Sequence, residues 1–133
     1  MNSLTTTEVR FLFQQATSAY SNGDPVLAES LANELIQHEP QHADAHYLLG
    51  AIRLDHGDVT KALPLLETAM RLAPDHPGIQ YALGNAYYAL DQWSEAIQCY
   101  EHLRLLGQAN IQVFLNLGIA LHETQQNDMA AQI

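Results

Sequence analysis

The sequence predicts an all-α fold built from repeated pairs of antiparallel helices. Small residues recur every 34 positions along the 133-residue chain. Within each repeat the apolar residues follow helical spacing. Alternating runs rich in β-branched residues are absent, so no sheet is expected. A period of this length is typical of solenoids, in which each unit buries its apolar face against its neighbours.

Several series of small or turn-forming residues share this period, and they define the organisation of the chain. The recurring residues are Gly50, Gly84 and Gly118; Ala28, Ala62, Ala96 and Ala130; Pro40 and Pro74; and the pairs Gly23-Asp24 and Gly57-Asp58. We therefore place an N-terminal extension and cap at 1–8 and full repeats at 9–42, 43–76 and 77–110. The last segment, 111–133, is a truncated fourth repeat.

The first two repeats carry helix signals in order. Thr5 and Glu8 form the S/T-x-x-E pattern of a capping box, which places the first helix start there. In the second repeat, apolar residues keep helical spacing until His56-Gly57, where a turn is expected. Asp58 is the predicted cap of the following helix. Pro64 lies about six residues into that helix and predicts a tolerated kink.

The third and fourth repeats follow the same scheme. Helices are expected over Tyr81–Leu90 and Trp93–Leu106, with a turn at Asp91-Gln92. In the fourth repeat only Met129–Ile133 follow Asn127-Asp128, which is too short for a second helix. An open end of a solenoid leaves apolar surface bare. We therefore expect exposed apolar residues around Leu117, Leu121 and Met129, and a possible homo-oligomer through this end.

These positions resemble the tetratricopeptide repeat (TPR) family over about residues 9–133. The matching residues are Ala16, Ala28 and Pro40 in the first repeat; Leu49-Gly50, Ala62, Ala69 and Pro74 in the second; Leu83-Gly84, Tyr87, Ala96 and Tyr100 in the third; and Leu117-Gly118 and Ala130 in the fourth. Departures are His46, Arg53, Leu103 and Gln108. The resemblance implies a right-handed α-solenoid whose first helices line a concave groove. Within a repeat, the glycine at position 8 is expected to face the alanine at position 20.

Side chains on the groove side of the first helices are the candidate binding residues. Four of the six tyrosines fall there, and tyrosine offers contact area plus a hydroxyl at little entropic cost. The predicted partner-binding residues are Phe13, Thr17, Tyr20, Tyr47, Tyr81, Asn85, Tyr88 and Asn116. The asparagine amides are expected to bond to the backbone of an extended ligand. In the alternative interpretation, the tyrosines pack between neighbouring helices and the asparagines are solvated.

The charge of this side indicates which partners it excludes. Some TPR proteins clamp acidic chaperone tails with Lys and Arg on this face. Here position 5 of the successive repeats holds Phe13, Tyr47, Tyr81 and Leu115, and Arg10 is the only basic residue on this side. We therefore expect negligible binding of acidic tails. A neutral, apolar or mildly basic protein or peptide segment is the predicted partner.

Composition excludes several other classes of function. The chain has 5 basic and 15 acidic residues, which disfavours nucleic acid and anionic lipid as partners. Its N-terminus lacks the pattern of a secretion signal, and no segment is apolar enough for a membrane span. The single cysteine, Cys99, excludes an internal disulfide. A cytoplasmic protein is therefore expected.

The sequence gives no support for a catalytic or metal-binding site. His38, His42 and His46 are spaced by four, but Pro40 interrupts the helix between the first two. Cys99 fits a small packing residue. Glycine loops that cradle phosphate and nucleophile motifs are absent, so we expect no catalysis and no cofactor. The main hypothesis is a peptide-binding scaffold; the alternatives are an accessory or oligomerisation region of a larger enzyme such as a transferase, or a self-assembly module.

Overall fold

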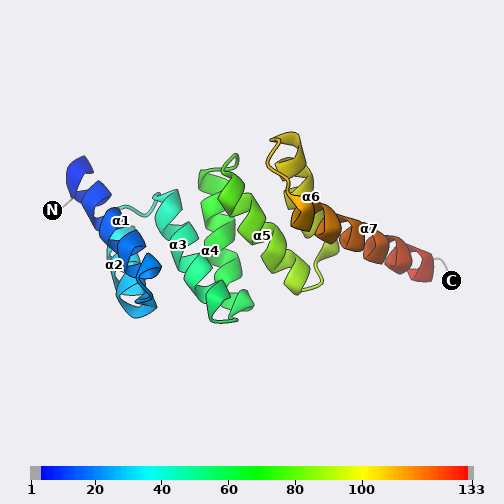
Figure 1. Cartoon of the computed structure of the whole chain (residues 1–133), viewed down its shortest axis with the longest axis horizontal. Coiled ribbons are helices and arrows are strands. Elements are labelled where there is room, and N and C mark those ends of the chain that lie inside the picture. The colour runs from blue at the N-terminus through cyan, green and yellow to red at the C-terminus, as the bar shows by residue number, and fades with distance from the viewer. Residues whose placement is uncertain (1–3, 132–133) are drawn as a thin grey trace. The chain divides into compact units, whose positions relative to one another are not determined.

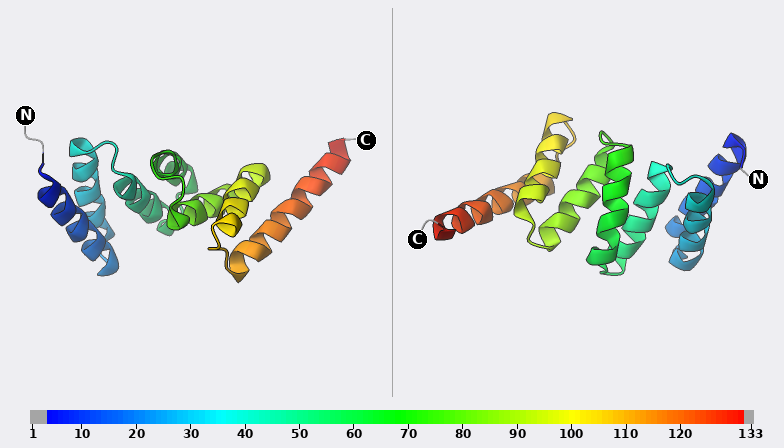
Figure 2. Two further views of the ribbon diagram at one scale, coloured as in Figure 1. Left: turned by 90° about the horizontal axis from the view of Figure 1, so that it is seen from above. Right: turned by 180° about the vertical axis from the view of Figure 1, so that it is seen from behind.

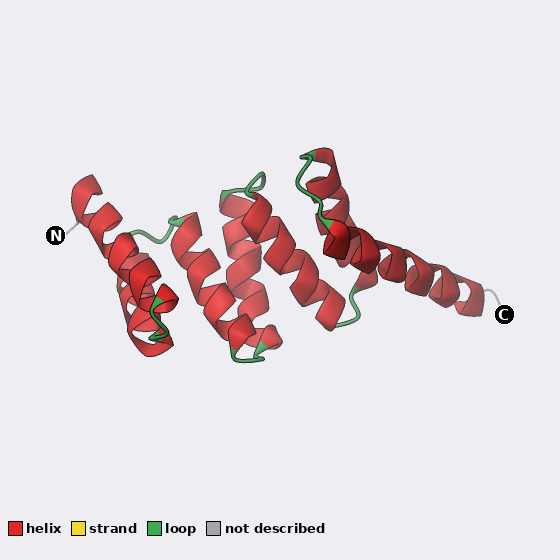
Figure 3. Ribbon diagram, viewed as in Figure 1, coloured by secondary structure: helices red, strands yellow, loops and turns green. Residues whose placement is uncertain are grey.

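Seven α-helices make up the described part of the chain. A computed structural model describes the backbone of residues 4–131 and the side chains of residues 4–129. Within this range it contains helices, turns and loops, and no strand (Figure 3). The predicted all-α class is therefore confirmed. The chain divides into two compact units, residues 1–73 and residues 74–133.

Unit 1 consists of two helical hairpins. Its helices are α1 (Thr6–Ser21), α2 (Pro25–His38), α3 (Ala43–Asp55) and α4 (Val59–Leu72), shown from blue to green in Figure 1. Helix α2 packs against α1 and also against α3, and α4 packs against α3. The core between them is built from small and aliphatic residues: Ala16, Ala19, Ala28, Ala32, Leu48, Leu49 and Ile52. The many alanines allow the helix backbones to approach closely.

Unit 2 consists of one hairpin and a longer single helix. Its helices are α5 (Pro77–Ala89), α6 (Trp93–Leu105) and α7 (Ile111–Ala131). Figure 2 shows α7, coloured orange to red, running past the end of the α5–α6 hairpin. Helix α6 packs against both α5 and α7. Among its described side chains, α7 has none that is buried beyond Ala120.

Helix starts agree with the sequence except at α5. Helices α3, α5 and α7 begin at residues 43, 77 and 111, which are the predicted starts of their repeats. Helix α1 begins at Thr6, inside the predicted extension, and its capping box is formed as expected. The apolar pattern predicted α5 only from Tyr81, four residues late. The helix starts at Pro77 because proline is preorganised for the first helical turn and lacks the N–H left unpaired there.

The turns within hairpins depend on one left-handed residue every 34 positions. Gly23 and Gly57 have φ values of 79° and 76°, and Asp91 takes the same place with φ 58°. Glycine adopts this conformation without steric cost, and aspartate tolerates it better than most residues. The corresponding residue in the fourth repeat is Gln125. Helix α7 passes through it and through Asn127-Asp128 without a turn.

The first helices of three repeats share a capping position. His42 and His76 accept from the backbone N–H groups of Ala45 and Ile79 through Nδ1, at 3.1 and 3.3 Å. Asn110 accepts from the N–H of Val113 at 2.9 Å through Oδ1. These bonds satisfy donors that lack a partner in the first turn of a helix.

We expect Asn110→Ala to lower the free energy of unfolding by about 1 kcal/mol, because the cap of α7 is lost. Asn110→Asp keeps an acceptor at the same place and adds a favourable charge at a helix N-terminus. Chemical denaturation followed by circular dichroism compares the two variants with the unmodified chain. Equal stability of all three proteins would show that the cap does not support α7.

Close approach within the α3–α4 and α5–α6 hairpins is made possible by a glycine, although its closest neighbour differs from the prediction. A Cβ placed on Gly50 would lie 2.6 Å from Leu66 Cδ2, and one on Gly84 would lie 2.9 Å from Tyr100 Cε1. Leu66 and Tyr100 occupy position 24 of their repeats. We expected position 20, Ala62 and Ala96, to face the glycines. The closest atoms instead belong to position 24, one helical turn further along the second helix. Ala62 also faces Gly50, since its carbonyl oxygen lies 3.7 Å from a Cβ placed there.

Candidate functional site

Three candidate residues of unit 1 form a stripe along α1. Phe13, Thr17 and Tyr20 follow one another at helical spacing, and all three are half-buried. The ring of Phe13 lies 5.2 Å from the ring of His42. Thr17 Oγ1 donates to the carbonyl of Gln14 at 3.0 Å. Phe13 and Tyr20 also pack against the core of the unit, so part of each ring has a structural role.

Tyr20 and Tyr47 are held as neutral phenols. The hydroxyl of Tyr20 donates to the carboxylate of Asp55, and this bond and partial burial raise the pKa of Tyr20 to about 12. Burial and the charge of Asp44 raise the pKa of Tyr47. Both hydroxyls therefore stay protonated at physiological pH. The Tyr20–Asp55 bond also joins the C-terminal ends of α1 and α3.

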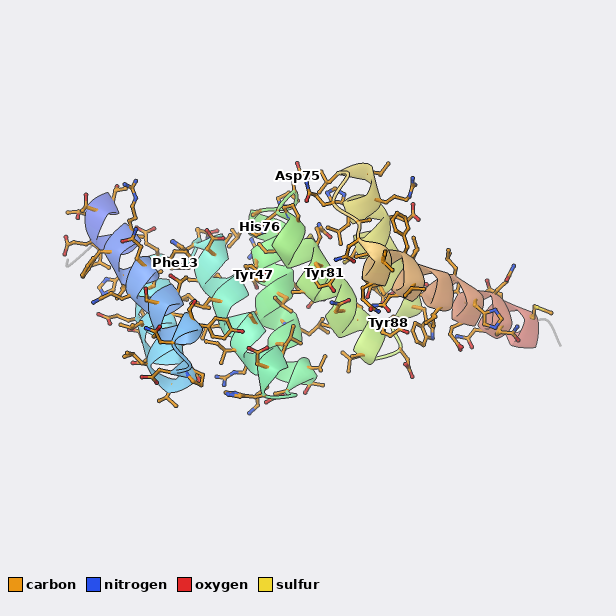
Figure 4. All side chains as sticks on the ribbon, viewed as in Figure 1. Phe13, Tyr47, Asp75, His76, Tyr81 and Tyr88 are labelled. Atoms are coloured by element: carbon orange, nitrogen blue, oxygen red, sulfur yellow. The ribbon has the colours of Figure 1, made fainter. Side chains whose placement is uncertain are left out.

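The candidate residues of unit 2 lie mainly on α5. Tyr81, Asn85 and Tyr88 are half-buried and follow one another at spacings of four and three. Figure 4 labels the two tyrosines on this helix. The ring of Tyr88 meets the edge of Trp93 at a centroid distance of 5.3 Å and an interplanar angle of 82°. This aromatic pair fixes the C-terminal end of α5 against the start of α6.

The two asparagines of unit 2 belong to one polar network centred on Tyr100. The hydroxyl of Tyr100 donates to Asn85 Oδ1 at 2.7 Å, and Asn116 Nδ2 donates to that hydroxyl oxygen at 3.2 Å. Asn116 Nδ2 also lies 3.5 Å from Asn85 Oδ1. Gln112 Nε2 donates to Asn116 Oδ1 at 2.8 Å. One network thus connects α5, α6 and α7.

This network changes the expectation for the asparagines. Asn116 is only 9% exposed, and its amide bonds to neighbouring side chains of the same unit. The Oδ1 of Asn85 is likewise occupied. The sequence analysis used Tyr100 only as a residue that matches the TPR pattern and assigned no role to its hydroxyl. The signal was present, because asparagines at position 9 of one repeat and position 6 of the next lie opposite a tyrosine at position 24.

Two residues next to the position-5 aromatic residues lie in the core. Leu48 and Ala82, at position 6 of their repeats, are 7% and 9% exposed. Leu117 was predicted as part of the exposed C-terminal end but is only 6% exposed. It lies on the side of α7 that packs against the rest of unit 2. Leu121 and Met129 are exposed as expected, at 49% and 59%.

His42 and His46 each have a ring nitrogen within hydrogen-bond distance of the backbone, and the thiol of Cys99 is buried. His42 Nδ1 is a helix cap, and His46 Nε2 lies 2.9 Å from the carbonyl of Pro40. No group of three His, Cys, Asp or Glu among the described residues is arranged to hold a metal ion. Cys99 is buried, and burial together with the charge of Glu95 raises its pKa to about 12. Such a thiol is a weak nucleophile.

None of the described helices combines the length and the apolarity that a membrane span requires.

Family comparisons agree with the repeat pattern. One family model described as tetratricopeptide repeat matches residues 13–77, and a second with the same description matches residues 53–117. Their combined range includes most of both units. The chain belongs to the tetratricopeptide repeat family.

Solved TPR structures share this fold. The first TPR of Spaghetti (RPAP3), bound to the HSP90 peptide SRMEEVD, matches with a TM-score of 0.79, 15% identity and coverage of 92% of this chain and 99% of that one. The TPR2B domain of yeast Sti1 in complex with an Hsp70 peptide matches with a TM-score of 0.77 and 13% identity, over 89% of this chain and 99% of that one. At these identities the likeness shows the fold alone. The predicted TPR solenoid fold is thus confirmed.

Two relatives of higher identity are much longer proteins. Protein FlbA of Caulobacter vibrioides is 26% identical over 119 residues, which are 90% of this chain and 20% of that protein. The O-GlcNAc transferase of Thermobaculum terrenum is 27% identical with a TM-score of 0.78, over 92% of this chain and 24% of that one. This TPR chain therefore spans about a fifth to a quarter of the length of these two relatives.

Two TPR positions on the first helices of this chain hold aromatic or acidic residues. Position 5 is aromatic at Phe13, Tyr47 and Tyr81, and position 13 is acidic at Asp55. Asp55 is exposed and ends α3, where the helix dipole disfavours a negative charge. A cationic group of a ligand would offset that cost.

Proposed function

We propose that this TPR chain is a non-enzymatic protein-interaction module that binds a peptide segment of a partner protein. The observation that carries the proposal is that the first helices of each unit carry half-buried aromatic side chains. The proposed contact residues are Phe13, Thr17, Tyr20 and Tyr47 in unit 1, and Tyr81, Asn85, Tyr88 and Asn116 in unit 2. Rings that are already partly fixed by packing lose little entropy when a ligand covers them.

The contacts described above divide this set into two groups. Tyr81 and Tyr88 are the proposed direct contacts of unit 2. Asn85 and Asn116 hold α5 and α7 together through Tyr100, so their contribution to binding is mainly to keep the surface in shape. In unit 1, Tyr20 and Asp55 form a hydrogen-bonded pair that offers a negative charge beside an aromatic ring.

Known TPR structures support a peptide ligand, and the charge of this chain selects its type. The RPAP3 and Sti1 domains are seen with chaperone peptides, and SRMEEVD is acidic. Lysine and arginine are missing from position 5 of this chain, whereas Asp44 and Asp55 lie on its first helices. We therefore propose a neutral, apolar or mildly basic segment as the ligand, and no nucleic acid.

Selection from a random nine-residue peptide library tests this function. We expect enriched peptides to contain aromatic or aliphatic residues with Lys or Arg, and to bind with micromolar affinity. The peptide SRMEEVD should show no binding at about 100 μM, a concentration at which a ligand of similar Kd would be half bound. Enrichment of acidic peptides, or binding of SRMEEVD, would contradict the proposal.

Two neighbouring phenylalanines provide a matched control for that selection. Phe13 lies on the proposed surface, whereas Phe11 is 60% exposed on the opposite side of α1. We expect Phe13→Ala and Tyr81→Ala to reduce binding of a selected peptide at least tenfold, with the helical circular dichroism signal retained. Phe11→Ala should bind as the unmodified chain does. Equal effects of the two substitutions at Phe11 and Phe13 would show that the peptide does not bind at the proposed surface.

An accessory region of a larger enzyme is the second candidate function. It is favoured by the likeness to a quarter of the Thermobaculum terrenum O-GlcNAc transferase chain. Sequencing the gene on both sides of this segment distinguishes the two. A catalytic domain in the same reading frame would make the repeats a substrate-presenting or oligomerising region, and its absence would favour the independent scaffold.

A further inference from the structure

Helix α7 is apolar on two opposite sides, and the structure covers one of them. Val113, Leu117 and Ala120 are buried against the rest of unit 2. The side that faces away carries large apolar residues with high exposure: Ile111 (78%), Phe114 (51%), Leu115 (56%), Ile119 (46%), Leu121 (49%) and Met129 (59%). A helix that is apolar all round is normally buried. We call the exposed side the Gly118 face, because Gly118 lies in its middle.

The first helices of the preceding repeats show what occupies this face when it is covered. Gly50 and Gly84 hold the same repeat position as Gly118. A Cβ on either would lie within 3.0 Å of a large side chain, Leu66 on α4 or Tyr100 on α6. A Cβ on Gly118 would have nothing within 4 Å. The face is therefore shaped for an antiparallel helix that places a large apolar side chain on the glycine.

Helix α7 itself meets this requirement. It has a glycine for close approach and, four residues earlier, the half-exposed ring of Phe114. In an antiparallel pair of α7 helices related by a two-fold axis, Phe114 of each copy lies over Gly118 of the other. Such a self-complementary surface is what a symmetric dimer needs.

Charge also favours a second copy on this face. The chain carries a formal net charge of −10, which opposes contact between copies over most of the surface. The stretch from residue 105 to residue 122 contains no Asp, Glu, Lys or Arg. Two Gly118 faces can therefore meet without bringing like charges together.

We propose that two copies of this chain associate through α7, as antiparallel helices in which Phe114 of each copy packs on Gly118 of the other. Six apolar side chains, each about half to three-quarters exposed, offer on the order of 500 Å² per copy, which is the low end for a specific interface. The dimer is therefore expected to form in the micromolar range. Leu115 and Ile119 hold the same repeat positions as proposed peptide contacts. The residues changed in the tests of the dimer are not proposed peptide contacts, so either proposal can fail without the other.

Sedimentation equilibrium of the unmodified chain and of Gly118→Gln tests the proposal. The substitution has free space in the single chain, and glutamine favours a helix more than glycine does, so the variant folds. In the dimer the added side chain would separate the two helices. We expect the unmodified chain to dimerise between about 1 and 500 μM, and the dissociation constant of Gly118→Gln to be at least tenfold higher.

Ile111→Gln and Val26→Gln form a matched pair for the same measurement. The two residues are 78% and 77% exposed, one on the Gly118 face and one on α2. Ile111→Gln should weaken association severalfold, whereas Val26→Gln should leave it unchanged. A chain that is monomeric at 500 μM would overturn the proposal. So would a dimer that Gly118→Gln leaves intact or that Val26→Gln weakens equally.

A cysteine cross-link tests the crossing point. In a Cys99→Ala background, a mixture of Phe114→Cys and Gly118→Cys chains should form a mixed intermolecular disulfide readily on mild oxidation, because these two positions face each other in the antiparallel pair. Cysteine introduced in place of Ser30 on α2 should not. Equal cross-linking at both positions would show that the contact is random.

Discussion

Gly84→Leu is expected to lower the free energy of unfolding by about 3 kcal/mol or more, the upper range for overpacking a core. Gly84 is buried in α5, and a Cβ there would lie 2.9 Å from Tyr100 Cε1 and 3.1 Å from Cys99 Cβ. Neither neighbour can move aside easily. Tyr100 is fully buried and bonded to Asn85, and the Cβ of Cys99 is fixed to the backbone of α6. The helices must therefore separate.

The same substitution at Gly118 is the matched control. Both glycines occupy position 8 of their repeats within helices, but a Cβ on Gly118 meets nothing within 4 Å. Gly118→Leu should leave stability unchanged or raise it slightly, since leucine favours a helix more than glycine does. Thermal unfolding at low protein concentration, where self-association is minimal, compares the two variants. Equal melting temperatures would mean that α6 does not pack on α5 at Gly84.

This contrast also shows why the sequence could predict the hairpins but not all of their contacts. Gly50 and Gly84 mark the place where two helices approach, and that inference needs only the period and helical geometry. Which side chain meets the glycine depends on the crossing of the helices. Position 24, at Leu66 and Tyr100, lies nearer than position 20, a difference of one turn that periodicity does not resolve.

Helix ends were predictable where a capping or turn residue acts on the backbone next to it. Thr5, Asp58 and the left-handed residues at Gly23 and Gly57 act within their own turns, and the structure has them as expected. The start of α5 was placed late because the prediction followed the apolar pattern, which indicated a helix only from Tyr81. Proline ends one helix and begins another, and only the backbone hydrogen bonds distinguish the two.

The candidate site was predictable as a surface but not residue by residue. Helical spacing places Tyr81, Asn85 and Tyr88 on one side of α5. It does not reveal that the hydroxyl of Tyr100 on α6 donates to Asn85. Nor does it reveal that the amide of Asn116 donates to that same hydroxyl oxygen. Such contacts join residues that are 15 and 16 positions apart and depend on packing. The binding roles of the tyrosines remain predictions.

The hydroxyl of Tyr100 gives the second prediction of large effect. Tyr100→Phe removes the group that joins Asn85 Oδ1 to Asn116 Nδ2, while the ring still fills its place. Losing one partner of a buried hydrogen-bonded group costs about 1–3 kcal/mol, so we expect a loss of that size in chemical denaturation at pH 7. Tyr88→Phe keeps the ring beside Trp93 and should change stability by less than about 0.5 kcal/mol.

The pH profile separates this role from simple packing. Burial raises the pKa of Tyr100 to about 12, against an ordinary value of about 10 for tyrosine. Because the folded-state pKa is the higher one, the neutral phenol stabilises the fold fully below pH 10 and this stabilisation is lost as pH rises toward 12. The unmodified chain should therefore lose stability over that interval more steeply than Tyr100→Phe. Parallel profiles for the two proteins would show that Tyr100 ionises equally in the folded and unfolded chains, and would contradict its place at the centre of a buried network.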